Sequence, residues 1–592
     1  MKPAPCRPVI YQLFVRTFGN SNERRALNGT LEENGCGKFA DITDKALASL
    51  REMGFTHVWL TGVLEQASGT AYPGCPADEP ALLKGVAGSP YAIRDYFDVS
   101  PDYAVDPDRR LDEFRDLLAR CEKHGLAPLI DFVPNHVARS YHSDVRPEWS
   151  FGDGDDPSVF FDRDNHFYYL QPHHPGGGPP LRLPWGTVYE PECAAGRVTG
   201  NNAVTWSPSV HDWYETVKLN YGHDFTTGRG TGHLPGPDAT LAEVPRTWRV
   251  MDEILGWWQE MGVAGFRADM AHLVPMEFWA WALRRARERR SDAWFMAEAY
   301  DNDPAKLCDG HVLDELLRAG FDAVYDDPAY DVLEAIYDEG GWANDLDPLT
   351  HTGPRFHRSL RYAENHDEVR LANPHTWGGR GMEVGRPVSA VLFALGRGPV
   401  MVYNGQEVGE PAVGRWGFGG DHGRTSIFDY GSMPEFTKWV NCGRFDGARL
   451  SQEQKELRAW YGRLLGLLQE PALAEGEFYG LNHANLENPG FGRIDGETYS
   501  GHWLYAFLRH DRRTHQAFLV VANFHGERTL EGVRVVIPLD AERWLARDGL
   551  ERWHFHDRLG DWSGEHASVE LRHEGLALPD LPPCSAMVIE IR

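Results

Sequence analysis

The stretch TWRVMDEILGWWQEMGVAGFRADMAH, residues 247–272, joins a helical pattern to a short apolar run that ends in polar residues. Apolar side chains recur every three or four positions over residues 247–262, and Gly262 stands where helices commonly stop. Residues 263–268 form a short, mostly apolar run, which predicts a buried strand. Asp269 follows that run directly. The stretch therefore predicts a helix, a buried strand and a polar loop in succession, as in parallel α/β folds.

The same unit recurs through the first 405 residues. Helical patterns include residues 43–54, 109–125 and 276–290. Eight strands that alternate with helices predict a (β/α)8 TIM barrel, whose active site lies on the loops after the strands. An open doubly wound sheet is the alternative, but it rarely runs to eight regular units with a large insertion. The predicted strands cover residues 9–16, 56–61, 127–132, 263–268, 294–297, 321–325, 361–363 and 399–403.

The chain of 592 residues is long enough for more than one domain. Residues 137–244 are rich in Gly, Pro, Asp, His and aromatics without a sustained period, which predicts an irregular domain inserted after strand three. Separated strand runs follow the helical residues 451–470 and predict a C-terminal antiparallel β-sandwich. The predicted division is a barrel of residues 1–136 and 245–472, an inserted domain of residues 137–244, and a C-terminal domain of residues 473–592.

The composition argues against several classes of partner. Lysine and arginine number 59 against 87 aspartates and glutamates, and the net charge of −28 would repel nucleic acid and anionic lipid. The N-terminal residues lack the pattern of a signal peptide, and about 18 consecutive apolar residues occur nowhere. Eight cysteines are scattered without CxxC spacing, which favours reduced thiols. We expect a cytoplasmic protein that binds neither nucleic acid nor membrane; the sequence predicts no particular oligomeric state.

Polar clusters follow four of the predicted barrel strands. They should open into one bowl, because the carboxyl ends of barrel strands meet on one face. Taken singly, an aspartate after a strand is more often a cap or turn residue. Cleavage of a glycosidic bond with retention needs two carboxyls ~5 Å apart, and neighbouring strands can place Asp269 and Glu298 in this way. The clusters are DFVPNH (131–136), GFRADMAH (265–272), AEAY (297–300) and ENHDE (364–368).

These four clusters, in this order, resemble the conserved regions of the α-amylase family of glycoside hydrolases. The resemblance covers nearly the whole chain. It implies that Asp269 is the nucleophile, that Glu298 is the general acid/base, and that Asp367 is the third carboxylate, which grips the ring hydroxyls and strains the sugar. Arg267, two residues before the nucleophile on the same strand face, would orient Asp269 and keep it ionised.

The resemblance also implies substrate-binding residues around the carboxylates. His136 and His366 match histidines that hydrogen-bond sugar hydroxyls, and Tyr91 matches a tyrosine that stacks on the ring at the cleavage point. Asp131 matches an aspartate that braces the site. Two further residues, at the ends of the second and third clusters, are predicted to contact substrate, namely His272 and Tyr300.

The family resemblance implies no cofactor for the chemistry and allows a structural metal ion. Many members bind calcium between the barrel and the inserted domain, through the asparagine that corresponds to Asn135. The inserted domain offers oxygen ligands such as FGDGDD, residues 151–156, which hard cations prefer. Such Asp- and Gly-rich runs are, however, more often solvated loops. Structural calcium at Asn135 is thus an expectation.

The predicted activity is hydrolysis of α-1,4-glucosidic bonds in maltooligosaccharides or related α-glucans, through a covalent glycosyl-enzyme. The alternative is a glucanosyl or maltosyl transferase of the same fold, because both reactions share that intermediate. The segment GSPYAI, residues 88–93, resembles maltosyltransferases that use maltose 1-phosphate, and Ala92 stands where enzymes that trim single glucose units commonly have Asp. A catalytically inactive carbohydrate-binding protein is disfavoured because all three carboxylates and Arg267 are present.

Overall fold

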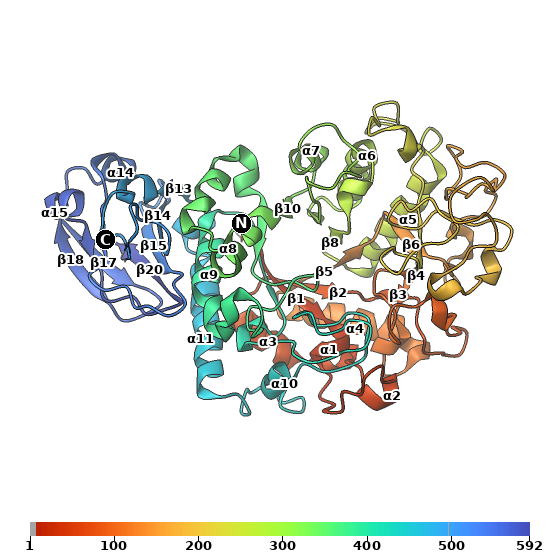
Figure 1. Ribbon diagram of the computed structural model, residues 1–592, viewed down its shortest axis with the longest axis horizontal. Coiled ribbons are helices and arrows are strands. Elements are labelled where there is room, and N and C mark those ends of the chain that lie inside the picture. Colours follow the sequence, from red (N-terminus) through yellow and green to blue (C-terminus); the bar gives the residue numbers. More distant parts are fainter. Residues whose placement is uncertain (1–6, 495) are drawn as a thin grey trace.

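A computed structural model describes residues 7–494 and 496–592, and eight parallel strands form a closed barrel at its centre (Figure 1). The barrel closes where β1 pairs with β12, with Val9 opposite Val400. All eight predicted strands are present, so the predicted TIM barrel is confirmed. In their order around the barrel the strands are β1 (Val9–Phe14), β12 (Val400–Tyr403), β11 (Ser359–Tyr362), β10 (Ala323–Tyr325), β9 (Trp294–Ala297), β8 (Gly265–Ala268), β5 (Ala127–Phe132) and β2 (His57–Thr61).

Most of the helices between these strands cover the barrel with one apolar face, whereas α9 is buried on nearly all sides. In α5 (Arg246–Met261) the buried residues Trp248, Met251, Leu255 and Trp258 recur every three or four positions. Gly262 ends this helix in the left-handed conformation, at φ 109°. The other helices include α3 (Asp44–Glu52), α4 (Arg110–Lys123), α6 (Met276–Arg289), α7 (Val312–Ala319), α8 (Asp327–Asp338), α9 (Gly385–Leu395) and α11 (Gln452–Leu467).

Two excursions from the barrel strands lie together at one end of the molecule (Figure 1). The first, after β2, contains the antiparallel pair β3 (Leu64–Gln66) and β4 (Ile93–Val99). The second, between β5 and α5, contains the antiparallel pair β6 (His136–Ala138) and β7 (Thr216–Lys218). Most of the remaining chain there consists of turns, and its apolar side chains form a cluster of their own around Tyr168, Trp206 and Tyr214.

The chain beyond α11 forms an antiparallel domain, as predicted. Its six-stranded sheet packs one face on α9 through β15 and β20, and its other face covers a separate apolar cluster (Figure 1). A two-stranded sheet, β16 (Arg534–Val535) with β19 (Leu576–Ala577), contributes to that cluster. The six strands, in spatial order, are β13 (Glu477–Gly480), β14 (Leu504–His510), β15 (Ala517–Asn523), β20 (Ser585–Ile591), β17 (Arg552–Asp557) and β18 (Ser563–Ala567).

Two arginines join this domain and the N-terminal segment to the end of α9. The buried guanidinium of Arg509 donates to Gly396 O at 2.6 Å, and that of Arg7 donates to Phe393 O at 2.8 Å. Both acceptors lie at the carboxyl end of the helix, where carbonyl groups lack partners within the helix and cations are favoured. The contacts thus fix α9 against the sheet.

The described residues bear on two predictions, that no segment spans a membrane and that the cysteines are reduced. Among the described residues, no helix combines the length and the apolar character that a bilayer crossing requires. Seven cysteines are described, and each is a free thiol. Cys6 lies outside the described residues.

Candidate active site

The carboxyl ends of β8 and β9 carry the two carboxylates predicted to perform the chemistry. The backbone hydrogen bonds between neighbouring barrel strands continue past the ends of β8 and β9, because Asp269 N donates to Phe132 O and Glu298 N donates to Ala268 O. Met270 then turns the chain in the left-handed conformation, at φ 44°, and its N–H donates to Glu298 Oε2 at 2.9 Å. Backbone hydrogen bonds therefore fix the positions of both residues, and the N–H of Met270 also orients the carboxyl group of Glu298.

Arg267 on β8 connects these carboxylates to a third. Its Nη1 lies 2.6 Å from Asp269 Oδ1 and its Nη2 lies 2.8 Å from Glu298 Oε2. Nη1 also lies 3.4 Å from Asp131 Oδ1. The guanidinium is 1% exposed and lies 5.2 Å from the ring centroids of Trp59 and Tyr91. A single buried cation thus contacts carboxylates from β5, β8 and β9.

The carboxylates outnumber the cation, and their pKa values reflect this. Burial raises the pKa of Asp269 well above its usual range; Glu298 and Asp131 act in the same direction and Arg267 against it. Burial also raises the pKa of Asp131 to about 6, again against Arg267. Interacting carboxyls so close together titrate as a group. Burial therefore favours the protonated forms of Asp269 and Asp131, and Arg267 opposes that effect.

Asp367, after β11, forms a second polar group with His366 and Tyr91. His366 Nε2 lies 3.1 Å from Asp367 Oδ2 and 2.6 Å from Tyr91 Oη. The other ring nitrogen lies 2.8 Å from Gln12 Nε2, and burial lowers the pKa of His366 to about 3. Tyr91 Oη also donates to Asp131 Oδ1 at 3.3 Å. A neutral imidazole, fixed on both edges, therefore links Asp367 to the carboxylate cluster.

His136 and Asn135, after β5, contact the inserted segment. The ring of His136 lies 5.1 Å from that of Trp213, and burial lowers the pKa of His136 to about 3. Asn135 Nδ2 donates to Gly200 O at 2.9 Å. Asn135 Oδ1 accepts a hydrogen bond from Lys218 Nζ.

The groups around Asn135 do not fit a calcium ion. Lys218 Nζ donates to Asn135 Oδ1 and, at 3.1 Å, to Leu273 O, so an amino group already contacts the oxygens that would bind the metal. Calcium takes six to eight oxygen ligands, commonly carboxylates. Within residues 7–494 and 496–592, the only cluster of three or more Asp, Glu, His or Cys side chains with metal-ligand spacing is Glu65, Asp98 and Asp144.

The last two predicted substrate contacts differ in their placement. Tyr300 Oη donates to Glu298 Oε1 at 3.1 Å and lines the cavity beside it. His272 is fully buried, its Nε2 lies 2.9 Å from Asp303 Oδ2, and it is not among the residues that line the cavity. The structure therefore places His272 behind the cavity wall, where it orients the loop after β9.

A cavity of about 280 Å³ brings most of the predicted residues together. Tyr91, His136, Asp269, Glu298 and Asp367 all line it. Sequence reasoning missed the wall formed by the excursions and by the loop after β12, since those residues belong to none of the four motifs. The additional lining residues are Met270, inside the cluster of residues 265–272, and, outside all four clusters, Lys84, Ser89, Trp213, Glu215, Thr216, Ile427 and Phe428.

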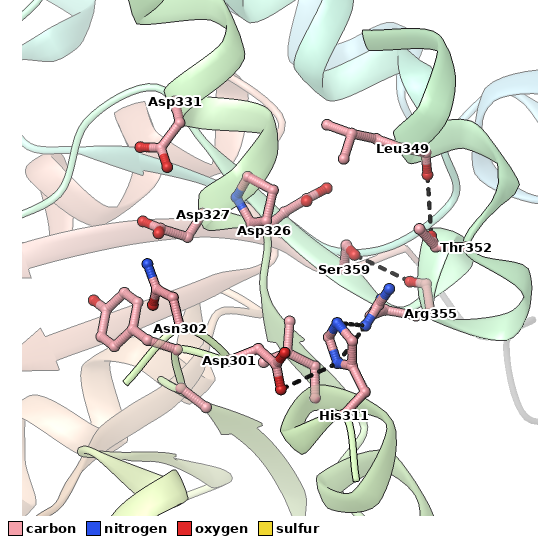
Figure 2. Close-up of a pocket in the computed structure, with 14 residues that line it drawn as sticks. Asp301, Asn302, His311, Asp326, Asp327, Asp331, Leu349, Thr352, Arg355 and Ser359 are labelled. Carbon is pink, nitrogen blue, oxygen red and sulfur yellow. Dashed lines mark hydrogen bonds and ion pairs between the residues drawn. The ribbon is translucent and has the colours of Figure 1, made fainter. Parts of the chain in front are cut away.

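A second cavity, of about 300 Å³, shares Tyr300 with the first. Figure 2 shows the residues that line this second cavity. Asp327 and Asp331 lie on one side of it, and His311 and Arg355 lie on the other, where Arg355 Nη1 contacts the imidazole at 2.6 Å. Burial raises the pKa of Asp327 to about 6. Because Tyr300 contacts Glu298, this polar cavity lies beyond the acid/base candidate.

The family model for the catalytic domain of α-amylase matches residues 12–309, which include the end of β1, all of β2 to β9, and both Asp269 and Glu298. The chain belongs to the α-amylase family. Maltase 1 of Drosophila virilis is 27% identical over 264 residues, 44% of this chain and 31% of that protein. The α-1,4-glucan:maltose-1-phosphate maltosyltransferase of Rhodospirillum rubrum is 37% identical over 57 residues, 10% of this chain and 8% of that protein. The chain thus aligns with about a third of Maltase 1.

Solved structures of α-amylase family proteins share the fold. An α-amylase from Lactobacillus plantarum superposes with a TM-score of 0.58 at 18% identity, covering 99% of this chain and 98% of that one. The shared fold therefore extends past the barrel into the inserted segment and the C-terminal domain.

Proposed function

We propose that this α-amylase family protein is a retaining glycoside hydrolase that cleaves α-1,4-glucosidic bonds of maltooligosaccharides or related α-glucans. The observation that carries the proposal is the shared guanidinium of Arg267, which holds Asp269 by one nitrogen and Glu298 by the other. A guanidinium spans only a few ångströms, so the two carboxyls face each other at the short range, ~5 Å, that retention requires.

The free atoms of the two carboxyls match their proposed roles. Asp269 Oδ2 has no hydrogen-bond partner among the described residues, and Asp269 lines the cavity, so this oxygen is free to attack the anomeric carbon. Glu298 Oε2 accepts from Arg267 and from Met270 N. Oε1 contacts no cation among the described residues, so it is the oxygen that would carry the transferable proton, and Tyr300 Oη would then accept from it.

The reaction then has two steps. Asp269 forms a bond to the anomeric carbon while the bond to the leaving oxygen breaks and Glu298 protonates that oxygen. Glu298, now ionised, takes a proton from a water molecule, whose oxygen attacks the anomeric carbon and releases Asp269. Asp367 lines the cavity and would hold ring hydroxyls through both steps, with the neutral His366 in contact behind it.

Incubation of the purified protein with maltoheptaose tests the proposal. We expect only shorter maltooligosaccharides to accumulate, with the α-anomer formed first when products are followed by proton NMR. Asp269→Asn removes the attacking oxygen and should lower kcat by at least about 10⁴-fold. Substantial turnover by that variant would refute the assignment of the nucleophile.

Transfer to another acceptor is the second candidate, favoured by the short segment at 37% identity to a maltosyltransferase. The same incubation with orthophosphate separates the two. Products longer than maltoheptaose, or phosphorylated ones, identify a transferase, whereas shorter sugars alone identify a hydrolase.

We propose that the amino group of Lys218 occupies the position that a structural calcium ion would take beside Asn135. We also propose that the protein is cytoplasmic. The contacts of Lys218 with Asn135 and Leu273 support the first proposal. The free thiols of the seven described cysteines support the second, since reduced cysteines are typical of the cytoplasm.

A further inference from the structure

We propose that Lys84, Glu215 and Trp213 bind a second glucose unit, next to the ring that is cleaved, and so make the enzyme prefer chains over single glucosides. This inference rests on the proposed function, because it assigns the neighbouring unit of the same substrate. All three residues line the cavity that holds Asp269 and Glu298. None of them belongs to the four motifs at the strand ends.

The first observation is a buried ion pair in the cavity wall. Lys84 Nζ lies 3.1 Å from Glu215 Oε1, and the two residues are only 9% and 4% exposed. Lys84 belongs to the excursion after β2, whereas Glu215 directly precedes β7 in the inserted segment. The pair therefore joins the two excursions at the edge of the cavity.

The second observation is that this pair leaves hydrogen-bonding capacity unused. Glu215 Oε2 is buried and has no hydrogen-bond partner among the described residues. A buried carboxylate oxygen without a partner is costly, and an ammonium carries three donors. Two adjacent hydroxyls of a sugar ring would match this set, one donating to Glu215 Oε2 and the other accepting from Lys84 Nζ. Burial also raises the pKa of Glu215, against the effect of Lys84.

The third observation is an aromatic surface between the ion pair and the site of cleavage. Trp213 lies two residues before Glu215, and its ring packs 5.1 Å from that of His136. Its side chain is partly exposed and lines the cavity. An indole combines a broad apolar face with a polar edge, which suits one face of a sugar ring. Since the proposed function places the cleaved ring beside His136, Trp213 and Glu215 are placed for the next unit.

A purely structural role for the ion pair predicts a different outcome. In that case the pair would only tether the excursions, with the help of Tyr214 Oη, which donates to Leu83 O at 3.2 Å. Loss of the pair would then lower stability and weaken every ligand alike. A binding role predicts loss confined to ligands with more than one ring.

Maltoheptaose binding to the Asp269→Asn variant, measured by calorimetry, tests the inference separately from catalysis, because this variant should not turn the substrate over. Adding Glu215→Gln or Trp213→Ala should weaken maltoheptaose binding about tenfold, the usual cost of losing one hydrogen bond to a charged group or one aromatic contact. Binding of glucose, measured by competition, should change less than twofold. Glu192→Gln is the matched control, because Glu192 is equally buried in the inserted segment but does not line the cavity.

The outcomes separate the two proposals. Unchanged maltoheptaose affinity, an equal loss for glucose, or absence of maltoheptaose binding by Asp269→Asn would each overturn the inference. Turnover of maltoheptaose by the unsubstituted protein decides the proposed function on its own. A protein that cleaves maltoheptaose with unchanged binding in both variants would keep its proposed function and lose only the second glucose site.

Discussion

Arg267 shows how one side chain can organise a site. Its two terminal nitrogens contact Asp269 and Glu298 at 2.6 and 2.8 Å, and one of them also approaches Asp131. The planar fork fixes the carboxyls relative to each other, because its nitrogens cannot move independently. A lysine in the same place would offer one point charge, which can satisfy one carboxylate well or two poorly.

We therefore expect Arg267→Lys to lower kcat/KM for maltoheptaose at least about 100-fold, through loss of carboxyl alignment. Steady-state kinetics measure this. Arg287→Lys is the matched control, because Arg287 pairs with Asp322 at 2.8 Å on α6, away from the cavity, and should change kcat/KM less than twofold. An Arg267→Lys variant with near-normal kcat/KM and an unchanged Tm would contradict the role assigned to the fork.

At the residue scale, the sequence motifs predicted those residues of the candidate site that lie within them. Asp269, Glu298 and Asp367, which follow strand ends, line one cavity together with Tyr91, which the family resemblance had indicated. His366 contacts Asp367 and Tyr91. Lys84 and Glu215 could not be found in this way, because their pairing depends on contact between two irregular excursions. His272 was expected to face the substrate, but its side chain turns toward Asp303, a partner that no local pattern specifies.

At the scale of elements, β6 and β7 attach the inserted segment to the barrel. His136 pairs with Lys218 in this ladder, and Lys218 Nζ reaches Asn135 Oδ1 after β5 and Leu273 O after β8. The amino group of Lys218 thus connects β7 to the loop after β5 and to the loop after β8.

The contacts of Lys218 predict that a chelator leaves the protein's stability unchanged. With EDTA, we expect the Tm to shift by less than about 1 °C. Lys218→Met should lower the free energy of unfolding by about 1–3 kcal/mol, because Asn135 Oδ1 and Leu273 O lose a buried donor. Thermal and urea unfolding measure both effects, with the exposed Lys123→Met as the control. A large fall in Tm with EDTA, restored by calcium, would show that a metal contributes instead.

Sequence patterns predicted the elements wherever burial gave a regular period. The barrel strands and α5 were predicted to within a few residues, since their apolar faces repeat at strand or helix spacing. In β17 only Trp553 and Phe555 are large and apolar, between Arg and His residues, and β18 has no large apolar side chain. Pairing with β20 and with each other, not a pattern of their own, makes these segments strands.

At the scale of the whole molecule, buried neutral histidines make stability depend on pH. Burial lowers the pKa of His136 and of His366 to about 3, below the value near 6.5 of an unfolded chain. Between these values the unfolded chain binds more protons, so stability is present above pH 6.5 and is lost as the pH falls toward 3. Asp131, whose pKa is raised to about 6, opposes this trend.

Each of these histidines should therefore contribute about 2 kcal/mol to the loss of unfolding free energy between pH 6.5 and 4.5. Between pH 6.5 and 4.5, the unfolding free energy of His366→Asn should therefore fall by about 2 kcal/mol less than that of the unsubstituted protein. This difference does not depend on the stability of the variant at pH 7. Urea unfolding at several pH values measures the slope. The exposed His211→Asn serves as the control, and parallel slopes for His366→Asn and the unsubstituted protein would contradict the prediction.

The position of β20 in the C-terminal sheet sets the order in which the molecule can be completed during translation. Residues 585–591 form the strand that joins β15 to β17 and that helps to cover α9. On the ribosome, α9 emerges almost two hundred residues earlier than this strand. Its apolar covering therefore stays incomplete while the nascent chain grows, and chaperones that bind exposed apolar segments would have their longest opportunity there.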